Sequence, residues 1–111
     1  MSEPTRIRYL YNASCPSYDE GLARLRAAAL EVGGEMVIEE QEITDDAEAE
    51  QLGFYGSPTY LINGRDPFAP PEGVPCAAEA CRAYHTSDGA ISPVPDRAQL
   101  IEALSAAAAA E

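Results

Sequence analysis

The chain alternates between runs of β-branched and aromatic residues and segments whose apolar residues recur at helical spacing. The first kind predicts four strands, over residues 6–11, 35–43, 59–62 and 81–85. Helical spacing predicts a helix over 18–32, a short acidic helix capped by Thr44–Asp46 and ending at Leu52, and a last helix from about 96 into the alanine tail. The resulting order, β-α-β-α-β-β-α, is typical of an α/β domain.

This order predicts one mixed sheet in a single domain. The strands over 6–11 and 35–43 should be parallel, because the helix between them carries the chain back across the sheet. The strands over 59–62 and 81–85 then add an antiparallel pair. A length of 111 residues fits one domain over 1–111, and residues 66–80, with four prolines and a glycine, predict an irregular insertion within it.

The charge balance bears on partners and compartment. The formal net charge is −12, and all seven cationic side chains are arginine. This excess of acid argues against nucleic acid and against an anionic membrane surface as partners, because both are bound by basic surfaces. The first residues lack a basic region followed by an apolar core, and no stretch approaches the roughly 18 apolar residues of a membrane helix. We therefore expect a cytoplasmic protein whose thiols are reduced.

Cys15 stands between the strand over 6–11 and the helix that follows. Ser14 is the expected N-cap of that helix, and Pro16 suits its first turn. Free N–H groups and the positive end of the helix dipole would stabilise a thiolate there. The alternative is that Cys15 is a small buried apolar residue.

Two segments resemble the thioredoxin superfamily. Ser14-Cys15-Pro16-Ser17, after a Tyr-Leu-Tyr strand, is similar to the active-site turn of that family. The run from Gly56 to Gly64 is similar to its cis-proline loop and the strand that follows. The resemblance spans essentially the whole chain apart from residues 66–80. It implies a minimal thioredoxin-like fold, with a four-stranded mixed sheet of order 2-1-3-4 and helices on both faces.

The resemblance also implies roles for single residues. Cys15 falls on the nucleophilic cysteine, and Pro58 falls on the cis-proline that packs against it. The backbone groups of Ser57 would be free to pair with an extended thiol substrate. Pro16 and Thr59 complete the implied substrate-binding set.

The chain departs from the dithiol pattern of that family at Tyr18, where a second cysteine would be expected. Cys15 could act as a monothiol, could pair with Cys76 or Cys81, or could belong to a domain that has lost redox chemistry. Cys81 opens the strand over 81–85, so we expect it some distance from Cys15. Cys76 lies on a loop that is free to fold over.

Two smaller hypotheses concern other polar residues. His85, with the three cysteines, would make a soft ligand set for zinc or a thiophilic metal, although the spacing matches no standard zinc module. Arg65 and Asp66 are expected to form an exposed ion pair. The acidic residues from Glu39 to Glu50 are expected to form a solvated face.

The leading functional hypothesis is a thiol–disulfide oxidoreductase-like protein with one active-site cysteine, Cys15, and Cys81 or Cys76 as the candidate resolving thiol. Its partner would be a protein or small-molecule thiol or disulfide, and no cofactor is expected. The alternatives are a non-enzymatic binding or accessory domain of the same fold, and a soft-metal-binding protein.

Overall fold

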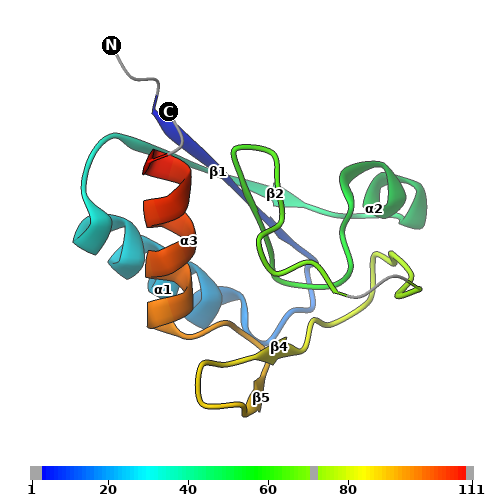
Figure 1. Cartoon of the computed structure of the whole chain (residues 1–111). Helices are drawn as coiled ribbons and strands as arrows, with labels where there is room; N and C mark the ends of the chain where they lie inside the picture. The colour runs from blue at the N-terminus through cyan, green and yellow to red at the C-terminus, as the bar shows by residue number, and fades with distance from the viewer. Residues whose placement is uncertain (1–3, 71–72, 110–111) are drawn as a thin grey trace.

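The computed structural model describes residues 4–70 and 73–109, and its elements follow one another as in Figure 1. Residues 71 and 72 of the expected insertion, the first three residues and the end of the alanine tail lie outside the described residues. The elements are β1 (Thr5–Tyr11), α1 (Tyr18–Val32), β2 (Met36–Glu42), α2 (Asp46–Leu52), β3 (Thr59–Ile62), β4 (Tyr84–His85), β5 (Ile91–Ser92) and α3 (Arg97–Ala109).

The main sheet has three strands in the order β2-β1-β3. β1 pairs in parallel with β2 over its whole length, from Thr5↔Met36 to Tyr11↔Glu42. β3 pairs with the other edge of β1 and runs antiparallel to it, from Ile7↔Ile62 to Leu10↔Thr59. The predicted parallel β-α-β unit is therefore confirmed.

The expected four-stranded sheet of order 2-1-3-4 is wrong. Residues 81–85 do not form a fourth strand, because only Tyr84 and His85 are extended in a ladder and both pair with β5 in a separate two-stranded sheet. A tight turn over 86–90 folds this hairpin locally, with Thr86 N–H donating to Ala90 O at 2.8 Å. Cys81 contributes a single bridge to Ser57, and that bridge is parallel.

One face of the sheet is covered by α1 and α3, which lie side by side in Figure 1. Alternate residues of β1 point to this face, as the two-residue period of a strand requires. The cluster buried here joins strands, both helices and β4. It comprises Ile7, Tyr9, Leu25, Ala28, Tyr60, Ile62, Tyr84, Leu100 and Leu104.

A second, smaller cluster forms around Leu10, which points to the opposite face of β1. Its members come from β1, from α2, from the residues that follow β2 and α2, and from residue 78, and they are Leu10, Ile43, Ala49, Phe54 and Ala78. The chain after residue 76 thus returns to the sheet beside α2. This return positions the candidate site described below.

The helix ends follow local signals with one exception. Asp45 caps α2 by accepting from Glu48 N–H at 2.8 Å, and Gly33 ends α1, as the sequence predicts. The N-cap of α1 is Ser17 and not Ser14. Two turns precede the helix, in which Cys15 N–H donates to Asn12 O and Tyr18 N–H donates to Cys15 O, so the first helical turn is delayed.

The acidic residues from Glu39 to Glu50 are mostly exposed, as expected. Within residues 4–70 and 73–109, none of the helices has the length and apolar character needed to cross a membrane.

Candidate thiol site

Cys15 is half-buried in the loop between β1 and α1. Its N–H donates to Asn12 O at 3.2 Å, and its carbonyl accepts from Tyr18 N–H at 3.4 Å. Since Ser17 is the N-cap, Cys15 lies two residues before the cap and three before the first residue of the helix, rather than in the first turn. The helix dipole therefore acts on this thiol from a greater distance than the sequence predicted.

The Ser57–Pro58 peptide bond is cis, as the resemblance implied. Pro58 is buried and packs against α1 at Gly21, where an added Cβ would lie 3.1 Å from the Pro58 ring. The same Cβ would lie 2.5 Å from the Tyr9 hydroxyl and 2.9 Å from the Tyr60 hydroxyl. Gly21 therefore lets the helix approach the proline loop closely.

Tyrosine hydroxyls fix the first turns of α1 over the sheet. Tyr9 OH donates to Tyr18 O at 2.8 Å, and Tyr60 OH donates to Gly21 O at 2.9 Å. Burial raises the pKa of Tyr9 and of Tyr60, so both stay protonated and keep donating at ordinary pH.

Asn12 links the Cys15 loop to two distant segments. It is 5% exposed, and its N–H donates to Ser57 Oγ at 3.3 Å. Its Nδ2 donates to Ala78 O at 3.0 Å and to Ala80 O at 3.2 Å. Because the Asn12 carbonyl also accepts from Cys15 N–H, one buried side chain and its backbone hold the proline loop, the Cys15 loop and residues 78–80 together.

Residues 78–82, called the strap below, form hydrogen bonds with the backbone groups of Ser57. Ser57 N–H donates to Ala80 O at 2.9 Å, and Arg82 N–H donates to Ser57 O at 3.1 Å. The strap also lies against Gly56, where an added Cβ would be 2.7 Å from the Cys81 carbonyl carbon. The expectation that the backbone groups of Ser57 are free for a substrate is therefore wrong, because the same chain already pairs with them.

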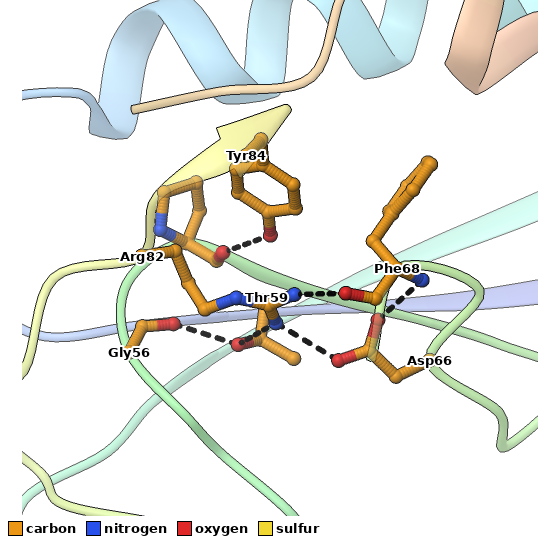
Figure 2. A network of polar contacts seen from close by, with 7 residues as sticks. Gly56, Thr59, Asp66, Phe68, Arg82 and Tyr84 are labelled. Carbon is orange, nitrogen blue, oxygen red and sulfur yellow. Dashed lines mark hydrogen bonds and ion pairs between the residues drawn. The ribbon is translucent and has the colours of Figure 1, made fainter. Parts of the chain in front are cut away.

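Arg82 anchors the end of the strap in a buried polar network (Figure 2). Its guanidinium pairs with Asp66 at 2.9 Å, and the side chains of the two residues are 4% and 8% exposed. It also donates to Phe68 O at 2.6 Å and to Thr59 Oγ1 at 3.3 Å. The guanidinium stacks 4.5 Å from the centre of the Tyr84 ring. The expected exposed pair of Arg65 with Asp66 is wrong, because Asp66 turns inward to Arg82.

The hydroxyl groups of Thr59 and Tyr84 donate further hydrogen bonds in this network. Thr59 Oγ1 donates to Gly56 O at 2.7 Å, so this side chain faces the protein interior. Tyr84 OH donates to Pro58 O, which joins β4 to the proline loop (Figure 2). Of the implied substrate-binding set, Pro58 and Thr59 are buried, and Pro16 is exposed beside Cys15.

The three cysteines are free thiols in different environments. Cys81 is exposed on the strap, beside Ser57. Cys76 is half-buried against the cluster around Leu10, and burial raises the pKa of its thiol, with a smaller contribution from Glu50. Asn12 is hydrogen-bonded to Cys15 itself and to Ala80, the residue before Cys81, so the loop of Cys15 and the strap share one buried anchor.

Within the part of the chain that the structure describes, no three His, Cys, Asp or Glu side chains form a group able to hold a metal ion. His85 belongs to β4, and its carbonyl accepts from Gln99 Nε2 at 2.6 Å. The soft ligand set of three cysteines and His85 is thus not assembled in this conformation.

No protein-family model, no curated protein and no solved structure matches the chain.

Several residues of this site were missed in the sequence. The sequence assigns Asn12 only to the break after the strand over 6–11, and Arg82 and Tyr84 only to the strand over 81–85. A single arginine two residues before a tyrosine gives no local sign of a buried partner. The Asp66-Pro67-Phe68 turn was one available signal, because an aspartate just before a proline favours a defined turn.

Proposed function

We propose that the protein carries out thiol–disulfide exchange, with Cys15 as the attacking thiol and Cys81 as the resolving thiol. The observation that carries this proposal is the pairing of the strap with Ser57 and Asn12, which brings the segment of Cys81 to the loop of Cys15. The relationship to the thioredoxin superfamily is part of the proposal. It is supported by the Cys15-Pro16 turn and by Pro58, which is buried against α1 at Gly21.

The proposed cycle transfers two electrons from the protein to a disulfide. The Cys15 thiolate attacks one sulfur of the substrate disulfide, forms a mixed disulfide and releases the other substrate sulfur as a thiolate. The Cys81 thiolate then attacks Cys15 Sγ, which releases the second substrate thiolate and leaves a Cys15–Cys81 disulfide. An external thiol reductant restores the two protein thiols by the reverse exchange. The expected cytoplasmic location would supply such a reductant.

Exposure favours Cys81 over Cys76 as the resolving thiol. Cys81 is exposed, whereas Cys76 is half-buried and burial raises the pKa of its thiol, which lowers the fraction of Cys76 that is thiolate at neutral pH. Cys76 also packs against the cluster around Leu10, on the α2 side of the sheet, whereas Cys81 lies beside the proline loop.

The test is to treat the reduced full chain with hydroxyethyl disulfide and to identify the products by peptide mass mapping. We expect a Cys15–Cys81 disulfide in the wild-type chain and in the matched control Cys76→Ser. Cys81→Ser should stop at a stable mixed disulfide on Cys15, and Cys15→Ser should form no internal disulfide.

A Cys15 that reacts no faster than free cysteine would overturn the proposed chemistry and leave the non-enzymatic binding domain as the interpretation. A Cys76–Cys81 product would keep a redox protein but remove Cys15 from its centre.

A further inference from the structure

The described residues form several open hollows away from the loop of Cys15. A hollow of about 430 Å³ lies over the exposed part of the sheet, with Arg6, Arg8 and Glu39 on its wall. Another, of about 340 Å³, lies between α1 and the start of β2. Neither carries a buried polar group that would select a ligand. The strap, in contrast, is hydrogen-bonded to both backbone groups of Ser57.

We infer that the strap excludes extended polypeptides from the proposed thiol site, so that the substrates of Cys15 are low-molecular-weight disulfides. This inference rests on the proposed function and specifies its substrate class. The residue next to Pro58, Ser57, has one N–H and one C=O with which an incoming chain could pair, and the strap uses both. A second extended chain would therefore have to displace the strap.

Displacement is opposed at both ends of the strap. At its start, Ala78 is 4% exposed, its N–H donates to Asp46 at 2.9 Å, and its carbonyl accepts from Asn12. At its end, lifting Arg82 would leave the Asp66 carboxylate buried without its partner, which is strongly unfavourable. The strap also lies against Gly56 too closely for another chain to fit between them.

A small molecule meets no such obstacle. A shallow hollow of about 420 Å³ lies over Asn12 and Ser14, in the segment just before Cys15, with Ile43, Thr44 and Glu79 on its other side. Cys15 itself is half-buried and does not line this hollow. A compact disulfide needs no main-chain pairing at Ser57 in order to react with this thiol.

The experiment compares two probes with the same reacting group. One is hydroxyethyl disulfide, and the other is a short unstructured peptide whose single cysteine is in a mixed disulfide with 2-mercaptoethanol. Initial rates of Cys15 modification are measured with the reduced full chain. We expect the peptide to react no faster than hydroxyethyl disulfide, at a rate linear in peptide concentration and insensitive to peptide sequence, because the peptide gains no main-chain pairing at Ser57.

Saturation with the peptide, together with a rate at least about tenfold above that of hydroxyethyl disulfide, would overturn the inference and leave the proposed function intact. Lack of reaction with both probes would instead overturn the proposed function, and the inference with it.

A variant that loosens the strap gives the converse test. Asp66→Asn weakens the anchor of Arg82, and we expect the ratio of peptide rate to hydroxyethyl disulfide rate to rise by about tenfold or more. An unchanged ratio in folded Asp66→Asn would count against the strap as the barrier.

Hydrogen exchange keeps the inference testable if that variant does not fold. In the wild-type chain the amides of Ser57 and Arg82 should be protected, because each donates to the opposite segment. Exchange of these two amides at the rate of an unfolded chain would overturn the inference.

Discussion

The β1-α1-β2 unit and the region after β3 are held together in different ways. In the first, seven consecutive residues of β1 pair with seven of β2, and the helix between them covers the ladder. In the second, β4 and β5 have two residues each, and the chain is fixed mainly by buried side chains that bond to backbone. Regular pairing of strands therefore forms the scaffold of this protein, whereas a few buried polar side chains hold its candidate site together.

Replacing Arg82 is the strongest test of the difference between the two regions. Arg82→Met keeps an apolar stem but leaves Asp66 buried without a cation and removes the bonds to Phe68 and Thr59. We expect a loss of about 3–5 kcal/mol in the free energy of unfolding, measured by urea denaturation. The matched control is Arg97→Met, because Arg97 pairs with Glu31 at an exposed position. That change should cost less than about 1 kcal/mol; equal losses would show that the buried network is not special.

A second test exchanges an amide for a carboxylate at two asparagines. In Asn12→Asp the side chain cannot donate to Ala78 O and Ala80 O, so we expect a loss of about 1–3 kcal/mol and faster amide exchange at Ser57. Asn63→Asp is the matched control. The side chain of Asn63 acts there as an acceptor, through Oδ1, for the Arg6 N–H at 2.9 Å. A carboxylate accepts equally well there, and stability by urea denaturation should hardly change.

The contact between the two regions is tested at Gly21. Gly21→Ala should cost about 1–3 kcal/mol, because the new methyl group meets the Tyr9 and Tyr60 hydroxyls and the Pro58 ring. The cost should be smaller in a Tyr9→Phe background, where the nearest oxygen is absent, and a double-mutant cycle by thermal unfolding measures the difference. Additive effects would mean that the helix and the sheet can shift apart freely.

The smallest expected effect concerns Tyr18 at the start of α1. Its hydrogen bond to Glu40 raises the pKa of this phenol from 10.0 to about 12. Since the folded-state pKa is raised, the stabilisation is present below pH 10 and is lost as the pH rises through about 12. In Glu40→Gln the phenol should ionise at lower pH, which ultraviolet titration against Tyr18→Phe detects. An unchanged titration curve would rule out this hydrogen bond in solution.

The regular region could be predicted from the sequence, because local pattern decides it. The strand over 59–62 and the helix over 18–32 have the expected bounds, and the strand over 35–43 is shorter by one residue at each end. The strand over 81–85 could not be predicted correctly. Its alternation of buried and exposed residues is real, since Arg82 and Tyr84 are both buried. Both side chains, however, take part in a polar network and not in a fourth strand of the main sheet.

The candidate site divides in the same way. Cys15 and Pro58 could be identified from short motifs, and the cis bond before Pro58 is confirmed. The importance of Asn12 and of the strap could not be identified, because their contacts join residues remote in sequence. A single polar residue does not indicate which residue, many positions away in the sequence, its side chain will contact. The roles of Cys15, Cys81 and Cys76 in redox chemistry stay predictions.

The bond from Asn12 to Ala78 spans 66 positions of the chain, and this has a consequence for the order of folding. The β1-α1-β2 unit depends on contacts nearer in sequence and can form while the rest of the chain is still being synthesised. Ser57 acquires its backbone partners only once residues 80–82 have emerged. During synthesis, a chain that ends before the strap would already contain Cys15 and the proline loop, with the main-chain groups of Ser57 open to other polypeptides.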